Sequence, residues 1–131
     1  MASELEHTSG GSMAIKRLMA SSLGLIALQP VSAGFWLSGF EHASAIHAFV
    51  AAGLQLVALI QGVTAIVLWR RRRLSGRVAG LCAGLFVMVL LEAWAGRKGE
   101  YWLHLPMGVG ILVWLRETVR HGPRIGSSSA S

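Results

Sequence analysis

Four long apolar blocks dominate this chain, and three short connections separate them. Residues 18–40, 43–69 and 101–115 contain no Asp, Glu, Lys or Arg, and residues 78–95 contain only one. A helix needs about 20 mostly apolar residues to cross a bilayer, and the last block reaches this length with its amphipathic continuation to Val119. Barrel strands would alternate apolar and polar residues, which these blocks do not. The pattern predicts an all-α integral membrane protein, an up-down four-helix bundle.

The basic residues lie at the ends of these blocks and predict the topology. Lys16 and Arg17 precede the first block, five arginines lie within 70–77, and three lie within 116–124. Because Lys and Arg concentrate on the cytoplasmic side, both termini and the central connection are expected there. The expected location is multi-pass in a cell membrane, a bacterial inner membrane, with the lipid bilayer as partner. This placement accounts for the net charge of +6 and leaves no role for a nucleic acid.

The two ends of the chain differ in composition from the rest. Residues 1–12 and 125–131 are rich in Gly, Ser and Ala, which is typical of flexible added linkers. Residues 13–124 are therefore the predicted transmembrane domain. Cys82 is the only cysteine, so no intrachain disulfide can form, and we expect it to be a small core residue.

Gly80 and Gly84 form a Gly-x-x-x-Gly pair within the third block. Small residues at this spacing let two helices approach closely in lipid. The pair predicts a helix contact, either within the chain or in a homodimer through Gly80 and Gly84.

His47, His104 and Glu92 each lie just inside one end of a block. With a helical rise of about 1.5 Å per residue, all three lie roughly 5–6 Å from the extracytoplasmic ends of their helices. An ionisable side chain in a membrane span is costly and indicates a functional site. Two imidazoles at one depth therefore predict a shared ligand.

The chain also divides into two similar hairpins, each with a glycine near its outer turn and then a histidine. The pairs are Gly34 with His47 and Gly96 with His104. This similarity predicts equivalent positions for the two histidines.

Haem b is the ligand that requires the fewest protein ligands from these residues. It needs two axial imidazoles, here His47 and His104, and an apolar slot. Arg97 and Lys98 lie at the outer rim and are the expected partners of the propionates. Ligation by both histidines leaves no open iron position, so we expect electron transfer or haem handling. A closed zinc site would need four ligands.

Glu92 has two interpretations. It is either a proton-handling catalytic residue or a carboxylate that reaches the interface and pairs with Arg97 or Lys98. The first corresponds to a haem-modifying or quinone-linked oxidoreductase, with a quinone or a redox protein as partner. A third alternative is a non-haem metal or proton transporter, or an assembly subunit of a membrane complex. Glu41 and His42 in the first outer turn are expected to be solvated.

Residues 16–122 resemble one four-helix half of haem A synthase, or a related small bacterial haem-binding membrane protein. The resemblance rests on Leu103-His104-Leu105, on Glu92 followed one turn later by Gly96, and on the helix that begins near His47. In that family each half places a haem between the two equivalent histidines. The resemblance therefore implies haem ligation by His47 and His104.

Several residues differ from the pattern of that family. Ala43 stands where the family has a glutamate, Ala48 where it has an arginine, and Glu92 where it has a glutamine. The outer cysteine pair of the family is absent. The resemblance therefore favours haem binding over haem-modifying catalysis, and a homodimer would rebuild the eight-helix arrangement.

Overall fold

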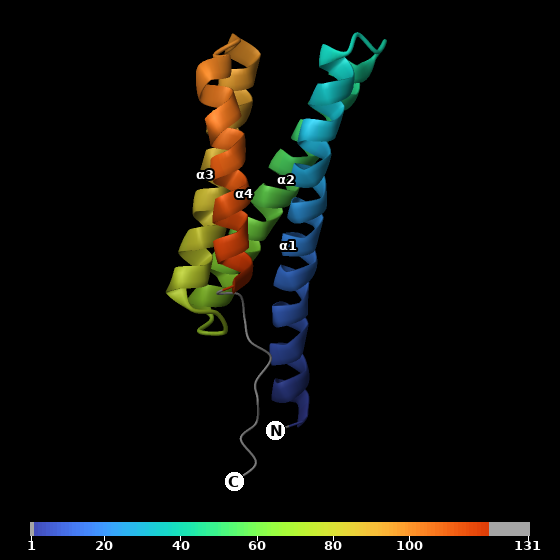
Figure 1. The fold of residues 1–131 in the computed structure, drawn as a ribbon. Helices are drawn as coiled ribbons and strands as arrows, with labels where there is room; N and C mark the ends of the chain where they lie inside the picture. Colours follow the sequence, from blue (N-terminus) through green and yellow to red (C-terminus); the bar gives the residue numbers. More distant parts are fainter. Residues whose placement is uncertain (1, 121–131) are drawn as a thin grey trace.

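The computed structural model describes residues 2–120, which form four helices (Figure 1). They are α1 (Ala2–Leu37), α2 (Ala43–Arg70), α3 (Gly76–Lys98) and α4 (Tyr101–Arg120). The all-α expectation is confirmed for this part of the chain. Residues 2–12 continue α1, whereas the predicted C-terminal segment 125–131 lies outside the described residues.

Short turns follow α1, α2 and α3 and reverse the chain. Gly39 and Gly99 adopt left-handed φ angles of 78° and 74°, which glycine allows without a steric penalty. Before α3, the Ser75 hydroxyl accepts a hydrogen bond from the backbone N–H of Val78 (3.3 Å) and caps the helix. Successive helices are therefore antiparallel neighbours.

The four helices form two hairpins that share one packed end. α1 packs on α2, α2 on α3 and α3 on α4, whereas α1 and α4 contact each other only sparsely. Figure 1 shows the α1–α2 and α3–α4 hairpins close together near the α2–α3 turn and diverging toward their own turns. The buried apolar clusters include Ala65 with Cys82 near the packed end and Leu54 with Leu85 in the middle of the bundle. The polar side chains of the predicted site lie toward the diverging end.

A buried polar chain links three helices in the middle of the bundle. Ser22 Oγ donates to Gln61 Oε1 (2.9 Å), and Gln61 Nε2 donates to Cys82 Sγ (3.5 Å). All three side chains are fully buried. Because fully buried groups find no water as a replacement partner, these bonds help to hold α1, α2 and α3 together.

Replacing Gln61 with alanine should destabilise the bundle by about 1–2 kcal/mol, because it removes both bonds and leaves Ser22 without its partner. Gln55→Ala is the matched control. Gln55 Nε2 donates only to Ala51 O on its own helix, so its loss should stay within about 0.5 kcal/mol. Thermal unfolding in detergent measures both, and equal losses would show that the chain of bonds contributes nothing.

Three of the helices are long and apolar enough to span a membrane. They are the Met13–Leu37 part of α1, α2 and α3. The shorter α4 has 20 residues with Pro106 inside it and is not among them. The composition of the described residues thus fits a multi-pass membrane protein.

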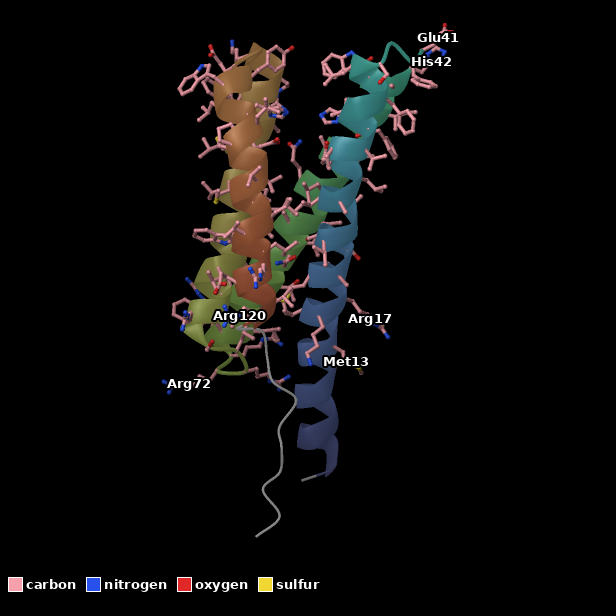
Figure 2. All side chains as sticks on the ribbon, in the orientation of Figure 1. Met13, Arg17, Glu41, His42, Arg72 and Arg120 are labelled. Atoms are coloured by element: carbon pink, nitrogen blue, oxygen red, sulfur yellow. The ribbon has the colours of Figure 1, made fainter. Side chains whose placement is uncertain are left out.

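The charged ends of the bundle agree with the sequence pattern. Figure 2 shows Arg17, Arg72 and Arg120 near the packed end, and Glu41 and His42 at the opposite end. These three arginines and the Glu41–His42 turn therefore lie at opposite ends of the bundle.

Gly84 is used for a helix contact within the chain. A Cβ atom on Gly84 would lie 2.6 Å from Cζ2 of Trp114, so the Trp114 ring rests directly on the α3 backbone. Trp114 Nε1 also donates to Leu81 O (2.8 Å). Gly80 faces open space. A homodimer through both glycines would have to share the Gly84 surface with Trp114.

Candidate functional site

His47 and His104 meet where the two hairpins diverge. The two ring centroids are 6.4 Å apart and the ring planes are inclined by 77°. His47 comes from α2 and His104 from α4, and both are partly buried. The structure therefore brings the two predicted ligands together, although they are 57 positions apart in the sequence.

Ser32 of α1 orients the His47 ring. Ser32 Oγ donates to the backbone carbonyl of Gln29 (3.0 Å) and lies 3.0 Å from His47 Nδ1. The His47 tautomer with its proton on Nδ1 satisfies both contacts at once, because Ser32 Oγ then accepts from His47 and donates its one proton to Gln29 O.

Glu92 of α3 orients the His104 ring in the same way. His104 Nδ1 lies 3.1 Å from the Glu92 backbone carbonyl and 3.0 Å from Glu92 Oε1. A carbonyl oxygen can only accept, so Nδ1 of His104 also bears the proton. Within residues 2–120, the Glu92 carboxylate contacts His104 and not Arg97 or Lys98, the partners expected in the second interpretation of Glu92.

The two histidines therefore share one hydrogen-bonding arrangement. In the tautomers with the proton on Nδ1, each ring donates to an oxygen of a neighbouring helix and has its lone pair on Nε2. Metal-binding histidines show this arrangement, because the outer hydrogen bond fixes the tautomer and the orientation of the ring. The site consequently offers two imidazole nitrogens that can bind a metal ion.

Gly96 gives the His104 ring its space. A Cβ atom on Gly96 would lie 2.9 Å from Cε1 and 3.0 Å from Nδ1 of His104. The ring thus packs on the backbone of α3, one turn after Glu92. Gly34, the predicted counterpart of Gly96 in the first hairpin, has open space at its Cβ position, so the two hairpins are not equivalent here.

A cavity of about 210 Å³ lies beside the two rings. Its polar lining consists of Gln29, His47, Glu92 and His104, and the remaining lining is apolar and comes mainly from α1 and α4. The cavity therefore combines two nitrogen donors and one carboxylate with largely apolar walls.

The remaining predicted site residues lie outside this cavity. Arg97 and Lys98 are exposed in the last turn of α3, at the diverging end of the bundle, but do not line the cavity. Glu41 and His42 contact each other at 3.6 Å with 89% and 80% of their side chains exposed, and Figure 2 shows them projecting away from the bundle. The expected solvation of both is consistent with this position.

Ser32 was not expected from the sequence to belong to the site. Its depth offered a signal, because it lies five residues before the end of α1, roughly 7–8 Å along the helix and level with His47. Sequence position alone does not show that the hydroxyl points toward α2.

Ser32→Ala should weaken metal or haem binding by about 10–100-fold, which is typical when a ligating histidine loses its outer hydrogen bond. The control is Ser38→Ala, because Ser38 Oγ donates to Gly34 O within the same helical end (2.8 Å) and is exposed. Haem titration followed by absorbance compares the two variants. Equal affinities would exclude an orienting role for Ser32.

The donor set of the site is small. Within residues 2–120, no group of three or more His, Cys, Asp or Glu side chains is placed to hold a metal ion.

Comparisons with known proteins found no matching family model, no similar curated protein and no similar solved structure. The functional proposal therefore rests on the geometry of the site itself.

Proposed function

We propose that this protein is a membrane b-type haem protein with His47 and His104 as the axial ligands. Its function would be electron transfer or haem handling, and the kinship with half of haem A synthase is part of the same proposal. The observation that carries it is the matched contact of each Nδ1 with an oxygen of a neighbouring helix, because this contact suits the tautomer whose Nε2 is free to bind a metal ion. Haem needs only these two protein ligands.

The separation of the two rings fits ligation of one metal ion. With metal–nitrogen bonds of about 2.0–2.1 Å, two imidazoles on opposite sides of an ion have ring centres roughly 6 Å apart. The observed separation is 6.4 Å. The angle between the ring planes is unconstrained, because each ring can rotate about its own metal–nitrogen bond. A direct edge-to-face contact between the rings has the same spacing, so a spectrum must distinguish the two.

The residues around the rings have defined tasks in this proposal. Haem, when bound, supplies a one-electron redox couple. His47 and His104 hold it, while Ser32 and Glu92 fix the orientation of the two rings. The apolar walls of the cavity exclude water. Arg97 and Lys98 provide positive charge at the diverging end of the bundle. With both His47 and His104 holding the iron, the site would leave no free iron position for oxygen activation.

The proposal places all four helices across a bacterial inner membrane with both termini in the cytoplasm. It is supported by the arginines near the packed end (Figure 2) and by large apolar side chains on the outside of the bundle. Phe49 of α2 and Leu105 of α4, for example, are 80% and 70% exposed. Such surfaces suit lipid, and α4 would then be the fourth span.

An absorption spectrum tests the proposed function. The full chain, purified in detergent and supplemented with haem, should show the Soret band and the sharp reduced bands of low-spin haem after dithionite. A protein that stays colourless would support a simple ring–ring contact and overturn the proposal.

A haem-modifying or quinone-linked oxidoreductase is a second candidate, favoured by the position of Glu92. Its carboxylate lies 3.0 Å from His104 Nδ1 and lines the cavity, so it could transfer protons to a bound substrate.

Glu92→Gln distinguishes this enzyme from a passive carrier. The amide oxygen of glutamine still accepts a hydrogen bond from His104, so haem content should be largely retained. In an enzyme, turnover with a quinol or with bound haem should fall by about 10²–10⁴-fold. Unchanged turnover, or no turnover in either form, would remove the catalytic role of Glu92.

A further inference from the structure

We infer that the cavity takes its macrocycle sideways from the outer leaflet of the bilayer, through the gap between α1 and α4. This inference rests on the proposed function and specifies where its ligand comes from. The cavity is lined mainly by these two helices, and they contact each other only sparsely. Figure 1 shows that they belong to the two hairpins that diverge toward this end of the bundle.

The edge of the cavity is apolar and exposed. Leu105, Val109 and Leu112 of α4 line it, although 70%, 63% and 40% of these residues are exposed on the outside of the bundle. Pro30 lines it from α1 and is also exposed. Apolar side chains that belong both to the cavity wall and to the outer surface mark an opening toward lipid.

The enclosed volume also requires an open side. The cavity of about 210 Å³ is smaller than the roughly 300–1,000 Å³ of pockets that enclose a small-molecule ligand. A macrocycle held between the rings would therefore extend past Val109 into the bilayer. Its apolar edge would contact lipid, which is favourable for an apolar body.

On the side of the site facing the first outer turn, an aromatic ring lies against His47. The Trp36 ring lies 6.1 Å from the His47 ring with the planes inclined by 34°, and it comes from the last turn of α1. Trp36 lies one turn nearer the turn than Ser32 and so covers His47 from that direction. Entry from lipid avoids displacing this ring.

Loading kinetics test the route. The full chain, purified without haem, is reconstituted in phosphatidylcholine vesicles that contain haem, and the growth of the Soret band is followed. Val109→Trp should slow loading several-fold, because the indole fills the gap. Val87→Trp on α3 is the matched control, since Val87 is exposed but does not line the cavity. Equal loading rates for both variants would overturn the inference.

A second measurement does not depend on haem. A nitroxide attached at Ala33→Cys, in a Cys82→Ser background, reports from the cavity wall. The label at position 33 should collide mainly with dissolved oxygen, as a label at lipid-facing Val31→Cys does. A label at Glu41→Cys should instead collide mainly with a water-soluble nickel chelate. A label at position 33 that behaves like position 41 would show an aqueous route. Absence of a Soret band in the wild type would defeat the proposed function but leave this measurement valid.

Discussion

Replacing either His47 or His104 with alanine should abolish the low-spin haem spectrum. Each substitution removes one axial nitrogen, so any haem that remains is five-coordinate, with a broadened and shifted Soret band. The affinity should fall by more than the about 10–100-fold expected for loss of a supporting hydrogen bond. Absorbance titration with haem, in detergent, measures both effects.

His42→Ala is the matched control for these variants. His42 belongs to the same half of the molecule, but its side chain is exposed and lies beside Glu41 in the outer turn. It should bind haem like the wild type, which would show that the effect is specific to the two facing rings. If His47→Ala and His104→Ala also keep the wild-type spectrum, haem is held elsewhere and the assignment of the ligands is wrong.

The helices were predictable because their signals are local and strong. An uncharged block such as 43–69 has few alternatives to a membrane helix, and α2 occupies Ala43–Arg70. The turns were predictable for the same reason, since Gly39 and Gly99 occur where the chain must reverse. The fourth helix also forms, but its composition is less apolar, and it is not among the helices apolar enough to span a membrane.

The depth of the site residues was predictable, and the directions of their side chains were not. The rise per residue places His47, His104 and Glu92 in one layer, and the structure brings these three together. The choice of His104 as partner of Glu92, instead of Arg97 or Lys98, depends on how α3 and α4 rotate about their axes. That rotation is set by packing between helices, for example by Trp114 on Gly84, which no local pattern reveals.

The similarity between the two hairpins was informative only in part. It pairs two histidines that do face each other, but the groups that orient them differ in kind. His47 is held by a neutral hydroxyl of α1, and His104 by the backbone and carboxylate of Glu92. Gly34 and Gly96 differ as well, because only Gly96 packs against a histidine ring.

Gly96→Ala should remove most haem binding while leaving the bundle at least as stable. The new methyl group would lie 2.9 Å from Cε1 and 3.0 Å from Nδ1 of His104, so the ring must move away from α3. That movement breaks the hydrogen bonds from Nδ1 to Glu92, and the affinity for haem should fall by about 10–100-fold. Thermal unfolding should show no loss from the backbone, because alanine favours a helix over glycine by about 0.5–1 kcal/mol.

Gly34→Ala separates the loss of space from the general effect of a methyl group. It occupies the corresponding position of the first hairpin, also within a helix, and its new Cβ would meet no atom within 4 Å. Both variants gain the same helix propensity, so any difference in haem affinity comes from contact with the imidazole. If Gly96→Ala binds haem as tightly as Gly34→Ala does, the packing of the His104 ring on the α3 backbone does not control ligation. In that case the ring must be free to bind iron from another position.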